Sequence, residues 1–336
     1  MTDKFRIPPA KLPNKDLFWK LVYFAGLFTV CFGFYLATEQ ANYIWRWNRL
    51  PRYFYYTETI EVRAEMEGEV ASITTKADDS VVIVEGVGDS EYYTIPGSDL
   101  KVAQGDTIYM GDVLGTYTEG RKGLLLDGLI VTIQVSIVAI ILGIALGLFT
   151  GLARISSNPA LKWSAITYIE LIRGSPLLVQ IMIWYFVIGT LINNLLATNG
   201  LPMIPEIWFG VLSLAIFAGA YVAEIVRAGI QSINKGQMEA ARSLGMTKTK
   251  AMAKIILPQA FKRILPPLAG QFISLIKDSS LLGVIAIREL TKATREAVTT
   301  SLMPYELWFL CGIMYLVITF TLSMFVQYLE KRTAEA

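Results

Sequence analysis

Long runs of apolar residues recur along this 336-residue chain, each about as long as an α-helix that crosses a bilayer. Apolar residues make up 54% of the sequence and charged residues only 17%, whereas soluble domains carry about a quarter charged residues. Because lipid offers backbone polar groups no water, a spanning segment must satisfy them within a helix. The composition therefore predicts an all-α polytopic membrane protein rather than a soluble enzyme.

Six membrane-spanning helices are predicted from the positions of these runs. The first, residues 17–37, is expected to remain in the mature chain, because a cleavable signal peptide would have a shorter apolar core and a small-residue cleavage site. The other five are residues 123–152, 163–196, 207–226, 264–287 and 305–329. The run at 163–196 is too long for one straight crossing, and Pro176 is predicted to split it into a lead-in and a spanning part.

Charge is distributed unevenly along the chain, which indicates its orientation. Residues 55–120 carry 14 Asp and Glu against 3 Lys and Arg, a net charge of −11, whereas the rest carries a net charge of +13. Cytoplasmic loops hold an excess of Lys and Arg. The basic arm 1–16, the loop 227–263 and the tail 330–336 are therefore predicted to be cytoplasmic, with both termini inside.

One loop conflicts with this orientation. Residues 288–304 would lie outside although they include three basic side chains near the start of the loop. Glu289 and Glu296 stand beside those side chains, and we expect ion pairs with them to reduce the conflict.

The segment after the first span combines two compositions. Residues 38–57 are aromatic and rich in arginine, which is typical of the membrane–water interface, and are predicted to form an interfacial linker. Residues 58–118 contain short alternating segments (EVASITT, SVVIVEGV and EYYTIP) separated by Gly, Asp and Ser. They predict a small acidic β domain, inserted into the helical protein on its extracytoplasmic side.

Several chemistries are excluded by missing residues. The chain has no histidine, which removes His-based triads and His-ligated metal sites. Its two cysteines, Cys31 and Cys311, lie in different apolar runs and cannot form a C-x-x-C site. No G-x-x-x-x-G-K-[ST] string occurs, so the chain lacks a P-loop of its own. We therefore expect no catalytic residue, no metal and no cofactor on this chain, and no nucleic acid partner.

The strongest motif lies in the basic loop. Glu239-Ala240-Ala241 is followed after three residues by Gly245 and, nine residues later, by Ile255-Ile256-Leu257-Pro258. This spacing resembles the EAA signature of bacterial ABC importer permeases, E-A-A-x3-G-x9-I-x-L-P, with every position filled. The resemblance implies a short coupling helix that docks on a separate ATPase. The alternative is an ordinary amphipathic basic loop at the surface of the membrane lipid.

The local sequence fits such a helix. Residues 237–244 can form two turns, and Gly245 can end them because glycine readily adopts a positive φ. The residues expected to serve ATPase coupling are Gln237, Glu239, Ala240, Ala241, Arg242, Leu244, Gly245 and Pro258.

Three further segments, residues 168–180, 219–233 and 270–290, are similar to those of the polar amino acid branch of these permeases. The resemblance covers about residues 124–329. It implies a type I importer core of five helices at 123–329, located in the bacterial inner membrane. It also implies the partners: two ABC ATPase subunits that bind ATP and Mg, a second permease chain (identical or related), an extracytoplasmic amino acid binding protein and a polar amino acid substrate.

The β domain departs from this family. Its strings VRAEMEGEVASI and VAQGDTIYMGDVLGTY resemble the two halves of a lipoyl- or biotinyl-type domain. Such carriers modify a lysine on a hairpin between strands, but residues 82–100 contain none, which argues against a carrier role. We hypothesise that the acidic domain helps dock the binding protein or a partner subunit.

Polar residues within the spans are candidates for the substrate path, because each is costly in contact with lipid. Lys277 and Asp278 would suit the two charges of an amino acid, although structural ion pairs with neighbouring helices remain an alternative. As sequence neighbours they point about 100° apart on a helix. The candidate path residues are Gln134, Lys277, Asp278, Ser279 and Ser280. For Gln134, helix–helix hydrogen bonding is an equal alternative.

A second set of residues is assigned to gating or to structure. Glu224 and Arg227 are spaced i,i+3 and could pair with each other. Glu170 and Arg173 precede Pro176, which the family resemblance marks as the bent entry to a span.

The predicted function is the permease subunit of an ATP-driven importer of polar amino acids, without catalysis on this chain. Other small polar solutes remain an alternative. A secondary transporter driven by an ion gradient is a weaker one, because it would usually show two related halves and would leave the EAA spacing unexplained.

Overall fold

The computed structural model describes residues 15–76, 79–97 and 99–335, which form two separate units. The first unit, ending at Trp47, holds α1 (Lys15–Gln40), whose apolar side chains are exposed on all sides. A helix that is apolar all round suits a lipid environment. Most of the basic arm predicted at 1–16 lies outside the described residues.

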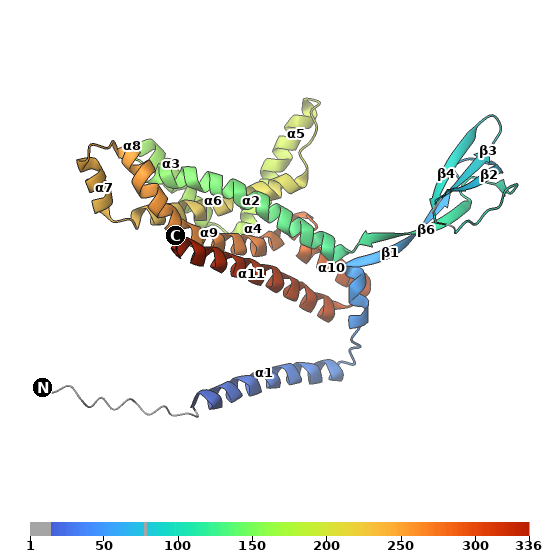
Figure 1. The fold of residues 1–336 in the computed structure, drawn as a ribbon, viewed down its shortest axis with the longest axis horizontal. Coiled ribbons are helices and arrows are strands. Elements are labelled where there is room, and N and C mark those ends of the chain that lie inside the picture. The colour runs from blue at the N-terminus through green and yellow to red at the C-terminus, as the bar shows by residue number, and fades with distance from the viewer. Residues whose placement is uncertain (1–14, 77–78, 98, 336) are drawn as a thin grey trace. The chain divides into compact units, whose positions relative to one another are not determined.

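The second unit contains the helical core (Figure 1). Its longer helices are α2 (Leu124–Arg154), α3 (Pro159–Gly174), α6 (Glu206–Gln231), α9 (Leu257–Asp278), α10 (Leu290–Ser301) and α11 (Pro304–Glu335). The shorter pieces are α4 (Leu177–Met182), the π-helical η2 (Ile183–Gly189), α5 (Thr190–Thr198), α7 (Lys235–Ser243), α8 (Lys248–Ala251), the π-helical η3 (Met252–Ile256) and the 3₁₀ helix η4 (Ser279–Ile285).

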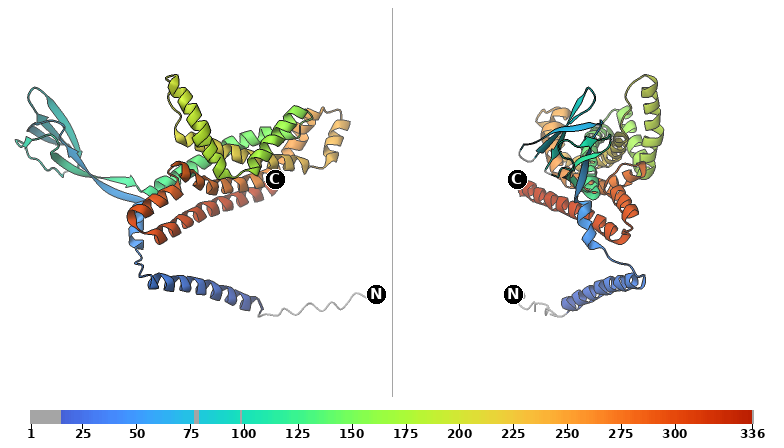
Figure 2. Two further views of the ribbon diagram at one scale, coloured as in Figure 1. Left: turned by 180° about the vertical axis from the view of Figure 1, so that it is seen from behind. Right: turned by 90° about the vertical axis from the view of Figure 1, so that its right-hand side faces the viewer.

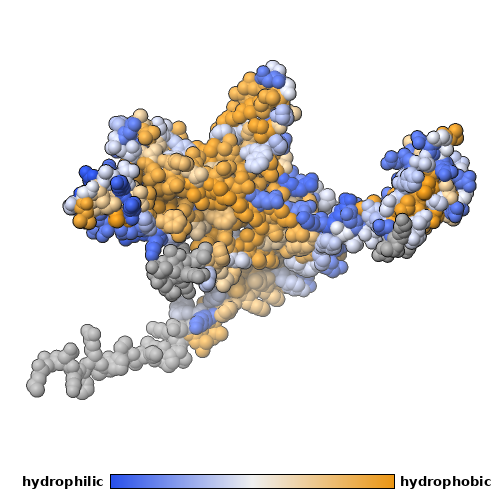
Figure 3. Space-filling view, turned by 45° about the horizontal axis from the view of Figure 1, so that its top comes forward, coloured by the Kyte–Doolittle hydropathy of each residue, from blue (hydrophilic) through white to orange (hydrophobic). Residues whose placement is uncertain are grey.

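Six helical stretches among the described residues are long and apolar enough to cross a membrane. They are Leu17–Gln40, Leu124–Arg154, Leu177–Thr198, Glu206–Gln231, Lys248–Ile285 and Pro304–Tyr328. Their number matches the prediction, and α11 continues through most of the expected tail at 330–336. Figure 3 shows apolar residues across the core helices and hydrophilic residues gathered around α7 and on the β strands.

The predicted break at Pro176 is present. α3 ends at Gly174, and α4 begins directly after Pro176. The side chain of Gln180 donates hydrogen bonds to the carbonyl oxygens of Ile172 and Ser175, at 2.7 and 3.1 Å, which satisfies acceptors at the broken helix end. The lead-in and the span are thus two helices held together by one buried amide.

Three glycines bring α2 against α6. Gly143, Gly147 and Gly151 are spaced by four residues and so lie on one face of α2. A Cβ atom built on Gly147 would lie 2.5 Å from Cβ of Val222, and one on Gly143 would lie 2.9 Å from Cβ of Ala218. Small residues at such spacing let two membrane helices approach backbone to backbone.

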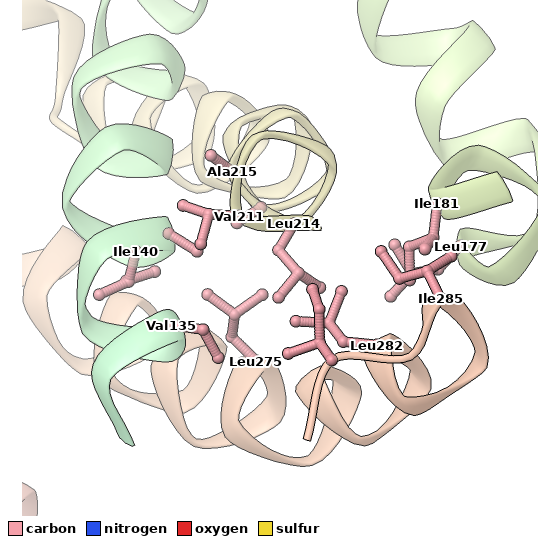
Figure 4. Close-up of a cluster of buried hydrophobic side chains, with 13 residues drawn as sticks. Val135, Ile140, Leu177, Ile181, Val211, Leu214, Ala215, Leu275, Leu282 and Ile285 are labelled. Carbon is pink, nitrogen blue, oxygen red and sulfur yellow. The ribbon is translucent and has the colours of Figure 1, made fainter. Parts of the chain in front are cut away.

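The largest hydrophobic cluster lies where α2, α4, α6, α9 and η4 meet (Figure 4). Val135 and Ile140 of α2 face Val211 and Leu214 of α6, and Leu282 of η4 is fully buried between them and α4. α11 runs alongside α9 (Figure 2).

Six strands occupy residues 55–122 and are called the β module here. β1 (Tyr55–Arg63) and β6 (Val113–Lys122) form an antiparallel ribbon in which Tyr55 lies opposite Lys122. The other strands are β2 (Gly68–Lys76), β3 (Asp79–Glu85), β4 (Ser90–Pro96) and β5 (Thr107–Ile108), in the sheet order β4-β3-β2-β5. The three segments predicted as strands are β2, β3 and β4.

The predicted interfacial linker, residues 38–57, is less uniform than expected. It begins with the last turn of α1, contains the 3₁₀ helix η1 (Trp47–Tyr53) and ends with the first residues of β1. Tyr53 is buried against Leu125 of α2 and Leu290 of α10, so η1 is attached to the helical core.

The loop expected at 288–304 is largely the helix α10. Glu296 pairs with Arg288, Nε to Oε2 at 2.8 Å, and with Lys292 at 3.8 Å, as expected. The expectation for Glu289 was wrong. Its carboxylate is fully buried and accepts the backbone N–H groups of Thr291 and Lys292, both at 2.7 Å, because it caps the start of α10.

Candidate functional site

The segment with the E-A-A spacing forms the short helix α7, followed by a sharp turn. Asn234 caps its start, because its side chain accepts the N–H of Gly236 at 2.8 Å. At its end the N–H of Met246 donates to the carbonyl of Ala241, and Gly245 has φ +82°. The predicted role of Gly245 as a helix stop with positive φ is confirmed in the structure.

The two faces of α7 differ. Ala241 is buried and Met238 is half-buried, and Met238 packs on the hydrophobic cluster formed by α6, η3 and α9. The remaining coupling candidates on α7 and its C-cap, Gln237, Glu239, Ala240, Arg242 and Leu244, are exposed. Leu244, directly after the last residue of α7, is 84% exposed. α7 therefore has one face fixed to the core and one face open to a partner.

Additional contacts connect the segment around α7 to the neighbouring helices. Pro258 follows directly after the π-helical η3, an irregular turn at which the helix can accommodate a residue without a backbone N–H. Arg263 of α9 donates to the carbonyl of Ser232 at 2.6 Å, and Gln259 lies 3.4 Å from the side chain of Gln237. The segment is thus tied to both α6 and α9.

An ion-pair network joins α2, α3 and α6 near the end of α2. Arg154 pairs with Glu224, and Glu224 also pairs with Arg227, Oε2 to Nη2 at 2.8 Å. Arg154 lies 3.9 Å from Glu170 of α3. The Glu224 and Arg154 side chains are only 16% and 20% exposed, so their charges are shielded from water. The predicted pair of Glu224 and Arg227 is confirmed.

Arg173 contributes to the same region through an aromatic ring. Its guanidinium lies 5.2 Å from the centre of the Tyr221 ring on α6, a cation–π contact. The four charged residues assigned to gating or structure therefore gather around α6, and Pro176 forms the helix break described above. Arg154 was missed, because nothing in the linear sequence relates it to Glu224, 70 residues away.

The candidates for a substrate path are only partly brought together. Lys277 and Ser280 line a cavity of about 330 Å³ with Thr291 of α10 and with Trp308 and Tyr315 of α11. Asp278 is half-buried but does not line this cavity, and Ser279 is buried with its hydroxyl bonded to the carbonyl of Ile276. No salt bridge to Lys277 or Asp278 exists in the described part of the chain.

Gln134 is separated from this cavity. It is exposed on α2, whereas Thr132 and Ser136 are fully buried on the opposite side of the helix. The Thr132 hydroxyl accepts the N–H of Leu290 at 3.0 Å, which ties α2 to α10. Thr132 and Ser136 therefore serve helix packing and do not join Gln134.

The contact of Glu289 with Tyr315, a lining residue of the cavity, was not recognised from the sequence. Glu289 accepts a hydrogen bond from the hydroxyl of Tyr315 at 3.1 Å, and Tyr315 Oη lies 3.1 Å from the Thr291 hydroxyl. Glu289 is thereby a buried carboxyl group held by backbone and side-chain donors next to the cavity of Lys277. A carboxylate directly before a helical pattern was the available signal, since acidic residues favour helix N-termini.

Comparison with known proteins shows which family the chain resembles. The family described as binding-protein-dependent transport system inner membrane component matches residues 143–335. The chain is 40% identical over 209 residues to a probable glutamine ABC transporter permease of Bacillus subtilis, covering 62% of this chain and 93% of that protein. It is 36% identical over 209 residues to the glutamine transport system permease of Escherichia coli K12, covering 62% and 92%.

A solved structure agrees with these relatives. The crystal structure of an amino acid ABC transporter with histidines is 41% identical to this chain, with a TM-score of 0.55. The match covers 62% of this chain and 94% of that one. The β module lies outside residues 143–335, so the family match is carried by the helical core alone.

Proposed function

This chain belongs to the family of binding-protein-dependent transport system inner membrane components, and from that premise we propose how it works as the permease of an ATP-driven importer. Its relatives named for glutamine transport and its six apolar helices support import of polar amino acids through the inner membrane. The chain is a transport subunit, and ATP with its Mg²⁺ binds to partner ATPase subunits. We propose two such subunits, a second permease chain and an extracytoplasmic binding protein.

The observation that carries this proposal is the geometry of α7. Its exposed face, with Glu239 and Leu244, is free to contact an ATPase, and its other face is packed on α6 and α9. A push on α7 is therefore transmitted to two membrane-spanning helices, which is what rigid-body coupling requires. The hydrogen bond from Arg263 to the Ser232 carbonyl stiffens the connection.

We propose that the ion-pair network of Arg154, Glu170, Glu224 and Arg227, called the clamp here, keeps the helices that receive this movement rigidly connected. It connects the ends of α2, α3 and α6 through Arg154 and Glu224, within one helical turn of Arg227. Since α6 leads directly into α7, movement of the coupling helix would act on all three helices together.

The substrate path is proposed to include the cavity of Lys277 and Ser280. A lysine ammonium there can bind the α-carboxylate of an amino acid, and hydroxyl groups of Ser280 and Thr291 offer further hydrogen bonds. The side chain of Trp308 closes one wall with an apolar ring. Asp278 lies outside this cavity, so we assign it no contact with the ammonium group of the substrate.

The orientation follows from the charge distribution. With α7 on the cytoplasmic side, both termini are cytoplasmic and the acidic β module is extracytoplasmic. Replacing residues 64–112 by an Asn-Gly turn would close the ribbon, because Arg63 lies opposite Val113. We expect this variant to assemble with its ATPase but to import less substrate. Unchanged uptake would contradict a role of the module in docking a partner.

The test of the coupling role uses the assembled transporter in lipid vesicles with its binding protein. Glu239→Lys reverses an exposed charge on α7, and we expect a roughly ten-fold loss of ATPase stimulation by the amino acid, which corresponds to about 1.4 kcal/mol of lost interaction with the ATPase. Lys162→Glu, an equal reversal on exposed α3, is the control. If no ATPase copurifies and Glu239→Lys transports normally, the gradient-driven alternative is favoured.

A further inference from the structure

Two arginines on η1 share one face of a helix attached to the core. In a 3₁₀ helix the residues i and i+3 lie directly above one another. Leu50 and Tyr53 therefore form one face, which packs on the core, and Arg49 and Arg52 form the neighbouring face, which is exposed. The packing of Tyr53 thus fixes the direction in which both guanidinium groups point.

The position of η1 places these groups at the edge of the bilayer. The N–H of Gly123 donates to the carbonyl of Phe54 at 2.8 Å, and a Cβ on Gly123 would lie 2.2 Å from the backbone of Tyr53. Gly123 immediately precedes α2, a 31-residue span, so η1 contacts this helix at its first turn. A residue beside the first turn of a spanning helix lies at the membrane–water boundary.

Neither arginine has an acidic partner among the described residues, although carboxylates are abundant nearby. Arg121, by contrast, pairs with Glu58 at 2.9 Å and with Glu119 at 3.3 Å. The Glu58 charge and the Glu119 hydrogen bond raise the pKa of Arg121. Arg49 and Arg52 therefore keep their full charge for an anion outside the chain.

A cavity of about 280 Å³ lies beside Arg52 and is lined by Tyr53, Tyr56 and Leu124. Arg52 is held over the ring of Tyr53, 5.1 Å from its centre, and donates to its hydroxyl at 3.1 Å. We propose that Arg49, Arg52 and this cavity bind the headgroup of an anionic phospholipid. The guanidinium groups hold the phosphate, and Tyr56 and Leu124 contact the glycerol and the first acyl carbons.

The apolar wall is the reason for choosing a lipid over a free phosphate. Leu124 is the first residue of a membrane-spanning helix, so a ligand bound here lies where polar surroundings give way to apolar ones. With the orientation proposed above, the bound lipid belongs to the extracytoplasmic leaflet. Exposed basic residues on that side are disfavoured by the positive-inside rule, and lipid binding gives these two a function.

The experiment measures lipid retention by the full-length chain in detergent, using native mass spectrometry with phosphatidylglycerol or phosphatidylcholine added. The double variant Arg49→Gln/Arg52→Gln should lose roughly thirty-fold of the preference for phosphatidylglycerol, because each arginine near anionic lipid contributes about five-fold. Arg63→Gln/Lys101→Gln removes the same charge from the β module and should keep the preference.

Three results would overturn the proposal. The first is equal preference in the wild type and the double glutamine variant, and the second is an equal loss in the control. The third is displacement of phosphatidylglycerol by inorganic phosphate, which would identify a site for free phosphate. If the glutamine variant does not fold, Arg49→Lys/Arg52→Lys should retain most of the preference, and wild-type retention should fall with added salt. Retention that is independent of salt would contradict the proposal.

Discussion

The coupling free energy of the ion pair between Arg154 of α2 and Glu224 of α6 can be predicted, because the chain also contains a more exposed ion pair for comparison. Replacing Glu224 by Gln removes one carboxylate that bonds both Arg154 and Arg227, whose side chains are 20% and 30% exposed. A hydrogen bond to a charged group contributes about 1.5–3 kcal/mol. We therefore expect a coupling free energy of about 2 kcal/mol between Glu224 and Arg154.

The control is the pair of Arg288 and Glu296, whose side chains are 61% and 31% exposed. Solvent-exposed pairs contribute about 0.2–1 kcal/mol, although their distance here, 2.8 Å, is short. Burial rather than distance should therefore decide the difference between the two pairs.

The assay is a double-mutant cycle on the free energy of unfolding. Glu224→Gln, Arg154→Gln and the double variant are unfolded in mixed micelles by added dodecyl sulfate, and tryptophan fluorescence follows the transition. The same cycle is measured with Arg288→Gln and Glu296→Gln. The reasoning is refuted if the Glu224–Arg154 coupling does not exceed that of the exposed pair.

Three other substitutions test separate features. Gly147→Ala should destabilise the chain by about 1–3 kcal/mol, because the added methyl group clashes with Val222. Gly270→Ala in α9 is the control, since a Cβ there meets no atom within 4 Å, and thermal unfolding of both variants measures the difference. Gly245→Ala, at φ +82° in open space, should cost about 1 kcal/mol of folding stability from the backbone alone, so a loss above 3 kcal/mol in the same unfolding assay would contradict this explanation. Lys277→Ala should lower substrate uptake while basal ATPase activity persists, and equal uptake by variant and wild type in vesicles would remove Lys277 from the path.

The sequence was most informative where one residue type controls local geometry. Pro176 predicted a helix break and Gly245 a helix stop, because proline and glycine restrict or permit the backbone whatever surrounds them. The number of spans followed for a similar reason, since bilayer thickness sets the length of an apolar run.

Contacts between distant elements could not be predicted. Arg154 meets Glu224 only because the glycines of α2 let it approach α6, and no local pattern indicates that pairing. Glu289 was expected at the surface with a basic partner, yet it is buried, because the start of α10 needs an acceptor for its free N–H groups. Gln134 is exposed and Thr132 buried, because residues two apart on a helix point about 200° apart.

The close contact of α2 with α6 determines where this membrane core can change shape. Sliding one helix along the other would carry Gly147 off Val222 and press the flanking Leu146 of α2 against the backbone of α6 near Gly219. We therefore expect the two helices to move as one rigid body during each transport cycle. We expect the core to bend instead at two segments with irregular backbones. They are the π-helical turn at Ile183–Gly189 and the 3₁₀ turn at Ser279–Ile285, which is followed by Ala286 at φ +64°.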